Sequence, residues 1–299
     1  MRLTLICQMT ILIFPLKKLF RLSPTVVPNN PFDKTWNLSY YDSDHGLDLT
    51  KKHHIGTPIF NLDSNSVSLV KNLYHQLITK VDNLNSEEII DFSVIAHSMG
   101  GLVIRALVQY KTSYKNGIVW LTDKVSISTI ALLGTPNHGT NLAKEWITIP
   151  AEIIIDTITD FFSIISGSFS LVHINNNSQM AQMVKNSRLL KELNKKEGIE
   201  GVKVITLRGM DNRLGLFPNL WEPFFFWKIR IDSNFPWIHI GVIKNDGIVH
   251  ADSVPLKGKN IKNYTVIEAN HQEMLNWITD SAGIQVKEKI LKHFMNNGN

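Results

Sequence analysis

The segment around residues 92–102 constrains the fold of this chain more than any other part of the sequence. The apolar run from Phe92 to Ala96 has the length of a buried strand. It is followed by Ala96-His97-Ser98-Met99-Gly100-Gly101 and by an apolar helix that starts near Leu102. Only small residues beside a sharp strand-to-helix turn let the two backbones approach this closely. The segment therefore predicts a strand, a tight turn and a helix packed against a sheet.

The rest of the chain repeats this alternation of short β-branched runs and amphipathic helices. A helix is expected where apolar residues recur at helical spacing: Val67, Val70, Leu73, Leu77 and Val81. Further strands are expected at Val125–Leu133, Val202–Leu207, Ile238–Ile243 and Tyr264–Glu268, and a last helix at Ile284–Phe294. The alternation predicts an α/β fold, with a mostly parallel central sheet flanked by helices.

One region, from Trp146 to Leu193, does not follow the alternation. It contains clusters of apolar residues, at 153–155, 161–162 and 164–165, followed by a polar stretch at 175–178. We interpret 146–193 as a helical cap, or lid, inserted into a single domain that spans residues 1–299. At 299 residues and 43% hydrophobic composition, the chain can bury a substantial core in one domain.

Charge and cysteine content narrow the classes of partner and site. The net charge is +5, but the lysines are scattered, which favours a solvated surface over a nucleic-acid site. Cys7 is the only cysteine, which excludes an intrachain disulfide and a cysteine-based zinc site. His53 and His54 have no carboxylate at ligand spacing, so a metal site is not expected there. No other pattern in the sequence calls for a cofactor.

The N-terminal run from Leu3 to Leu16 leaves three alternatives open. It has the length of a signal-peptide core, but it lacks a small-x-small cleavage site before Lys17-Lys18. It is too short for a conventional membrane-spanning helix. The alternatives are a buried first strand at the start of the run, a signal or membrane anchor, and a chain whose true beginning is missing.

Ser98 is the candidate nucleophile, since the predicted turn would lift its hydroxyl out of the sheet. A serine alone is a weak nucleophile and needs a histidine base that a third group orients. Asp246 follows the predicted strand 238–243, and His271 follows the predicted strand 264–268. The carboxyl ends of parallel strands lie at one edge of a sheet, so the three side chains are expected to meet there.

Other residues compete for these roles or surround them. Asp211 also follows a predicted strand and Asp252 lies nearby, but the Asp-Gly-Ile-Val context favours Asp246. His97 is expected to pack beside the turn, and His138 to shape a turn. The backbone amide of Met99, at a helix N-terminus, is expected to donate to a developing oxyanion.

These residues resemble the lipase and esterase branch of the α/β-hydrolases, including small bacterial lipases and families related to the GPI inositol-deacylases. Four segments between about Phe92 and His271 carry the resemblance. They are the nucleophile elbow 96–101, with Ala in place of its first Gly, the Gly-Thr-Pro segment 133–140, the acid turn 245–249 and the histidine turn 270–271. In segment 133–140, Asn137 precedes the histidine of the family pattern.

The resemblance implies an α/β-hydrolase fold in which Ser98, Asp246 and His271 form the catalytic triad. It also implies that region 146–193 is the lid and that the Met99 amide is one oxyanion donor. The family usually takes its second donor from a His-Gly pair after an early strand. If Leu3–Cys7 is that strand, Gln8-Met9 stands in the place of the pair.

The sequence therefore predicts a carboxylic ester hydrolase, lipase- or esterase-like, that forms an acyl-enzyme on Ser98 and acts on ester or lipid substrates. An acyltransferase with the same triad, and a non-catalytic relic that binds a lipid or a partner, stay open as alternatives. The aromatic run 220–227 could contact an acyl chain or a membrane surface, or pack the cap onto the core. A cytoplasmic or peripheral membrane location is favoured, and the oligomeric state is left undetermined.

Overall fold

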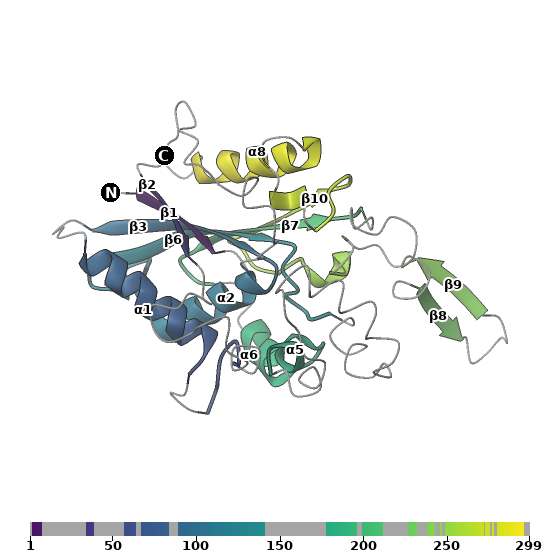
Figure 1. Cartoon of the computed structure of the whole chain (residues 1–299), viewed down its shortest axis with the longest axis horizontal. Coiled ribbons are helices and arrows are strands. Elements are labelled where there is room, and N and C mark those ends of the chain that lie inside the picture. The colour runs from purple at the N-terminus through teal and green to yellow at the C-terminus, as the bar shows by residue number, and fades with distance from the viewer. Residues whose placement is uncertain are drawn as a thin grey trace, which may run out of the picture.

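The computed structural model describes residues 2–7, 34–38, 57–63, 67–83, 89–140, 178–195, 199–211, 227–231, 238–242, 246, 249–271, 273–275, 277 and 280–295. A sheet of eight strands lies at the centre of this part of the chain (Figure 1). Six strands run parallel in the order β10-β7-β6-β3-β1-β2. Their bounds are β1 Arg2–Cys7, β2 Lys34–Leu38, β3 Ile90–His97, β6 Val125–Leu133, β7 Lys203–Gly209 and β10 Ile261–Val266.

A short antiparallel hairpin completes the sheet. Its strands are β4 Ser113–Lys115 and β5 Ile118–Thr122, and β5 pairs with the start of β6. Asn116 and Gly117 form the hairpin turn with φ angles of 54° and 80°, the left-handed backbone that an Asn-Gly turn supplies at low cost. The sheet is therefore mixed but mainly parallel, as the sequence predicts.

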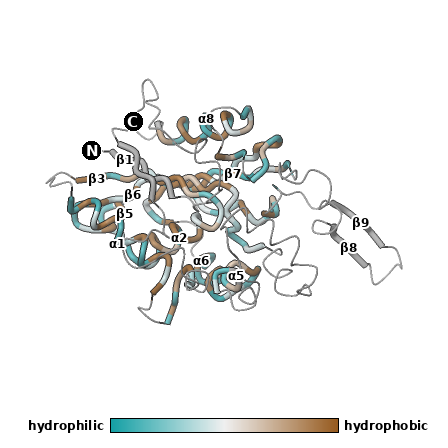
Figure 2. The backbone as a smooth tube through the Cα atoms, in the orientation of Figure 1, coloured by the Kyte–Doolittle hydropathy of each residue, from teal (hydrophilic) through white to brown (hydrophobic). Residues whose placement is uncertain are grey.

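Helices cover both faces of the sheet, in the layers of an α/β domain (Figure 1). Helices α1 Leu69–Asp82 and α2 Met99–Lys111 lie on one face, and α8 Ser281–Met295 lies on the other. Ser68 caps α1, because its side chain accepts a hydrogen bond from the Lys71 amide at 3.2 Å. Between the helices, the central strands are mostly hydrophobic along their length (Figure 2).

The two faces of the sheet have separate cores. The larger core joins α1, α2 and the sheet through buried side chains that include Leu73, Leu102, Val94 and Ile130. The smaller core packs Val286, Ile290 and Phe294 of α8 against Ile205 and Leu207 of β7. These three residues of α8 recur four positions apart, so they lie along one face of the helix that the sequence predicts at Ile284–Phe294.

One expected strand lies outside the central sheet. The run Ile238–Ile243 does form a strand, β9 Ile238–Val242, but β9 pairs antiparallel with β8 Trp227–Ile231 in a separate two-stranded sheet (Figure 1). The prediction that this run joins the parallel sheet is therefore wrong. Residue alternation indicates a strand but does not identify its partner.

The predicted cap falls mostly outside the described residues, since 141–177 are not among them. Its final part forms α5 Ser178–Met183 and α6 Arg188–Lys195, and α6 contacts α2. The cap and the single-domain organisation therefore stay predictions. Among the helices that the structure describes, none is long and apolar enough to cross a membrane.

Candidate active site

Ser98 occupies the turn between β3 and α2, where the sequence predicts a sharp change of direction. Its φ and ψ angles are 53° and −132°, a backbone conformation that residues with a side chain rarely adopt. The turn is held by a 2.9 Å hydrogen bond from the Ser98 amide to the Leu133 carbonyl. Its hydroxyl makes no capping hydrogen bond to α2. The side chain is half-buried at the carboxyl edge of the sheet.

Close packing around this turn explains why it needs small residues. A Cβ atom on Gly101 would collide with the side chain of Thr135. Helix α2 starts directly after the turn, at Met99, and the first amides of a helix have no partner within it. The N-terminus of α2 therefore lies beside Ser98, as expected for a site at which negative charge develops.

His271 and Asp246 form a buried pair. The Nδ1 atom of His271 lies 2.8 Å from Oδ2 of Asp246, and the two side chains are only 3% and 1% exposed. A carboxylate can only accept, so Nδ1 carries the proton and donates it to Asp246. This tautomer leaves the Nε2 atom of a neutral His271 as an acceptor.

The backbone around Asp246 fixes the direction of its carboxylate. The other oxygen, Oδ1, accepts a hydrogen bond from the Val249 amide at 2.7 Å, and the Asp246 carbonyl accepts one from the His271 amide at 2.8 Å. A Cβ on Gly209, the last residue of β7, would lie 3.0 Å from the Asp246 Cβ. The carboxylate therefore sits at the end of β7, although β9 precedes it in the sequence.

Gly134 connects the Ser98 turn to the His271–Asp246 pair. It directly follows Leu133, whose carbonyl holds the Ser98 amide, and its own amide donates to the Leu207 carbonyl at 2.9 Å. Gly134 has a φ of 52°, and a Cβ at this position would lie 2.9 Å from both Asp246 Oδ2 and His271 Nδ1. A side chain here would press on the two atoms of the histidine–aspartate hydrogen bond.

His97 packs beside the turn, as the sequence predicts, and also contacts His271. The two rings lie 4.4 Å apart between centroids, and the Nε2–H of His97 donates to the His271 carbonyl at 2.9 Å. Burial, and then the nearby His271, lower the pKa of His97 well below its usual value. His97 is therefore a neutral residue that holds the backbone of His271.

The other candidates have different surroundings. The side chain of Asp252 is 98% exposed and lies 3.9 Å from the Arg208 guanidinium. Asp211 is nearly buried, and its amide donates to the Ala269 carbonyl at 3.2 Å. The ring of His138 contacts the Pro255 carbonyl at 2.7 Å and the Asn194 amide group at 3.3 Å, as expected of a residue that shapes a turn.

Sequence reasoning missed Arg105, a buried residue of α2 that supports the loop after Gly134. Its guanidinium donates to the Asn137 side chain at 3.1 Å, the Leu193 carbonyl at 3.1 Å and the Asn194 side chain at 2.8 Å. These bonds tie the loop to α2 and α6. The available signal was a single arginine within the otherwise apolar stretch 102–108.

Two expectations concern residues outside the described ranges. The first is the second oxyanion donor, expected after β1. Cys7, the last residue of β1, pairs with Ala96, so β1 ends beside the Ser98 turn. Gln8-Met9, in the place of the second oxyanion donor, is not described, and neither is His53-His54. Within the described ranges, no group of three or more His, Cys, Asp or Glu side chains is placed to hold a metal ion.

Comparisons with known proteins give remote similarity. Residues 68–209 match a family described as a domain of unknown function, DUF7379. No curated protein matches the sequence. The mixed sheet with helices on both faces fits an α/β-hydrolase-like fold.

The solved structures that resemble this chain include lipases and esterases. EstA from Clostridium botulinum is 16% identical, with a TM-score of 0.41, over 69% of this chain and 64% of EstA. Phospholipase PlaB from Legionella pneumophila is 13% identical, with a TM-score of 0.43, over 85% of this chain and 46% of PlaB. The metagenomic carboxyl esterase MGS0156 is 13% identical, with a TM-score of 0.45, over 92% of this chain and 65% of that protein. In each case the match spans less than two thirds of the other protein.

Proposed function

We propose that this chain is a serine hydrolase of the α/β-hydrolase fold that cleaves carboxylic esters, with Ser98, His271 and Asp246 as its catalytic triad. The observation that carries the proposal is the buried 2.8 Å contact between His271 Nδ1 and Asp246 Oδ2 at the sheet edge that bears Ser98. A histidine oriented by a carboxylate beside a serine on a strained turn is the arrangement that nucleophilic acyl transfer requires.

In the proposed first step, the Ser98 oxygen attacks the acyl carbonyl and its proton passes to His271. Nε2 is the acceptor, because Nδ1 already holds a proton directed at Asp246. The carboxylate stabilises the imidazolium that forms. That cation then protonates the alkoxide leaving group, which departs as an alcohol and leaves the acyl group on Ser98.

Negative charge develops on the carbonyl oxygen during this attack. We assign the Met99 amide, at the start of α2, as one donor to that oxygen. Loss of a single donor of this kind typically costs about 3 kcal/mol of transition-state stabilisation. In the second step, His271 takes a proton from water as the water oxygen attacks the acyl carbonyl, and then gives that proton to the Ser98 oxygen as the acid is released.

The substrate class follows from the same proposal. The proposed hydrolysis of an ester needs no cofactor or metal beyond these residues. The same steps would cleave the ester bond of a lipid. We further propose that region 146–193 forms a lid over the site and that the aromatic run 220–227 contacts an acyl chain or a membrane surface. An assay with soluble and emulsified esters of increasing chain length tests this extension.

The hydrolysis of p-nitrophenyl butyrate by matched variants tests the proposal. Ser98→Ala and His271→Gln should each reduce kcat by about 10⁶-fold, and Asp246→Asn should reduce it by about 10³–10⁴-fold. Asp252→Asn is the control, since this carboxylate is 98% exposed and should leave the rate unchanged. An Asp211→Asn variant that loses activity while Asp246→Asn keeps it would overturn the assignment of the acid.

A further inference from the structure

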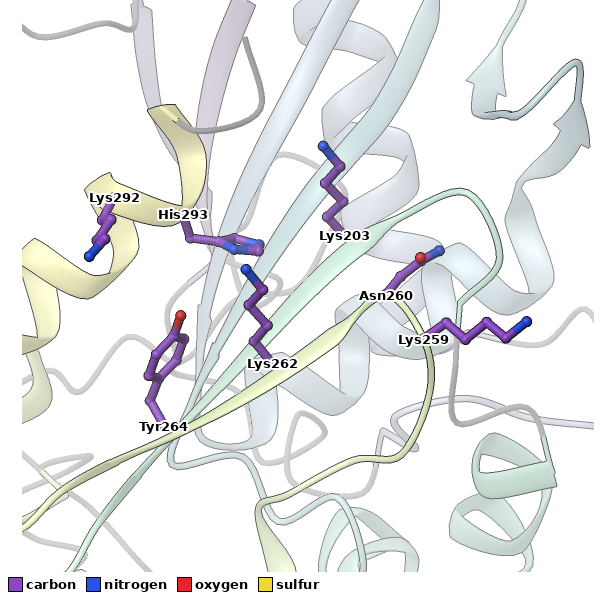
Figure 3. A pocket seen from close by; sticks show the side chains of 7 residues that line it. All are labelled: Lys203, Lys259, Asn260, Lys262, Tyr264, Lys292 and His293. Carbon is purple, nitrogen blue, oxygen red and sulfur yellow. The ribbon is translucent and has the colours of Figure 1, made fainter. Parts of the chain in front are cut away.

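A cavity lies at the opposite end of the parallel strands from Ser98. It has a volume of about 320 Å³ and lies where β7 and β10 begin and α8 ends (Figure 3). Because β7 and β10 are parallel, with Val204 opposite Ile261, their first residues lie far along the strands from the turns that hold Asp246 and His271. This cavity is therefore separate from the candidate active site.

The lining of this cavity is strongly basic. It consists of Lys203, Lys259, Asn260, Lys262, Tyr264, Lys292 and His293. Four of these seven residues are lysines, and none is acidic. The four lysines are exposed at its rim, and Lys289 lies 5.3 Å from the centre of the Tyr264 ring beside them. Like charges gathered without a carboxylate repel one another, and a bound anion relieves that repulsion.

His293 supplies a buried polar atom without a partner in this cavity. Its side chain is only 8% exposed, and its Nε2 atom has no hydrogen-bond partner among the described residues. Figure 3 shows the ring reaching from α8 over the start of the sheet toward the amine of Lys262. Buried polar atoms are nearly always satisfied in folded proteins, so an orphan in a basic cavity points to a ligand.

The protonation of His293 narrows the ligand class. Burial is the largest cause that lowers its pKa, to about 4, and the charges of Lys262 and Lys203 add to the effect. The backbone of Lys203 takes part in a hydrogen bond with the ring, which acts in the opposite direction. Because this hydrogen bond raises the pKa, the ring is its donor. Nε2 has no partner in the part of the chain that the structure describes, so the donor is Nδ1–H, and in the neutral ring Nε2 is the acceptor. The ligand must then donate a proton to Nε2 while its other atoms accept from lysines.

We propose that this cavity binds a phosphate group, whose protonated oxygen donates to His293 Nε2 while its charged oxygens accept from Lys203 and Lys262. A phosphate monoester has a second pKa near 6, and inorganic phosphate loses its second proton at a higher pH, so a large fraction of either carries an O–H group at about pH 6. Sulfate has the same shape but no such proton. The site should therefore select phosphate over sulfate, a distinction that a simple cluster of surface lysines would not make.

Calorimetric titration of the full chain with inorganic phosphate and with sulfate, at pH 6 and constant ionic strength, tests the proposal. We expect saturable binding of phosphate and at least tenfold weaker binding of sulfate. Lys262→Gln, at an exposed position, should weaken phosphate binding about tenfold or more, through the loss of one charged hydrogen bond. Lys115→Gln is the matched control, because Lys115 is an exposed lysine of β4 outside the cavity.

A second variant separates the role of His293 from general charge. His293→Gln places an amide group near the position of Nε2. An amide can both accept a hydrogen bond from the ligand and donate one to it, so the variant should select phosphate over sulfate less strongly than the wild type does. Equal binding of the two anions by the wild type, or unchanged binding by Lys262→Gln, would overturn the proposal. Ester hydrolysis by Lys262→Gln should stay at the wild-type rate, so the result does not depend on the proposed activity.

The phosphate group could belong to a soluble molecule or to a lipid headgroup. Sedimentation with vesicles of phosphatidylcholine, with and without 20% phosphatidic acid, distinguishes the two sources. Binding that requires phosphatidic acid and is lost in Lys262→Gln but not in Lys115→Gln assigns the site to a lipid. Binding of inorganic phosphate without vesicle binding assigns it to a soluble phosphate. Binding of neither would contradict the proposal.

Discussion

Gly134→Ala should strongly reduce the proposed esterase activity through a single added methyl group. The new Cβ would lie 2.9 Å from both Asp246 Oδ2 and His271 Nδ1, the two atoms of their hydrogen bond. Carbon does not approach these atoms so closely without moving them. The imidazole or the carboxylate must therefore move by several tenths of an ångström, which weakens the orientation of the proposed base.

The size of the effect follows from the role of the carboxylate. Loss of the orienting acid in a serine hydrolase lowers kcat by about 10⁴-fold, so partial displacement should lower it by about 10²–10⁴-fold. The substitution also carries a backbone cost, because Gly134 has a φ of 52°. An alanine in this conformation is destabilised by about 1–2 kcal/mol.

Gly117→Ala is the control that separates the two effects. Gly117 has a φ of 80°, and a Cβ there would meet nothing within 4 Å. Both variants therefore place an alanine in a left-handed backbone conformation, but only Gly134→Ala also adds a steric clash. Urea unfolding should show a loss of stability in both, while steady-state hydrolysis of p-nitrophenyl butyrate should show a loss of kcat in Gly134→Ala alone. A Gly134→Ala variant with the wild-type kcat would refute the reasoning.

Two further predictions concern the turn and the buried histidines. Gly101→Ala should destabilise the fold, because its Cβ would collide with Thr135; an overpacked core typically costs about 1–3 kcal/mol, and a variant that unfolds at the wild-type urea concentration would contradict this. The pKa values of His97 and His293 are lowered in the folded state, so unfolding takes up protons below about pH 6.5. Stability should therefore be highest above that pH and fall as the pH decreases below it, by up to about 1.4 kcal/mol per pH unit for each histidine, and the contribution of His293 to this fall should end near pH 4. Urea midpoints that stay constant over this range would exclude the effect.

Local elements of the fold could be predicted from the sequence, but contacts between distant segments could not. The strand, turn and helix around Ser98 were predicted because small residues and an apolar run suffice to identify them. The strand Ile238–Ile243 was also identified, but its sheet was not, since hydrophobic alternation carries no information about the partner.

The parts of the site that sequence reasoning missed depend on contacts across long stretches of chain. The sequence identifies Gly134 only as part of a family motif. This position must be a glycine because a side chain would contact Asp246 and His271, which lie more than 100 residues further along the chain. Arg105 and His293 were missed for the same reason. Their partners and surroundings come from elements that no local pattern links to them.

The central claim is that Ser98 is an activated nucleophile, and labelling with a fluorophosphonate tests it most directly. The probe would be applied to the full chain and to Ser98→Ala and Asp246→Asn, and the modified peptide would be identified by mass spectrometry. We predict that the wild type carries one label, on Ser98, that Ser98→Ala carries none, and that Asp246→Asn reacts far more slowly. A folded wild-type protein that is not labelled, or is labelled at another residue, would contradict the account.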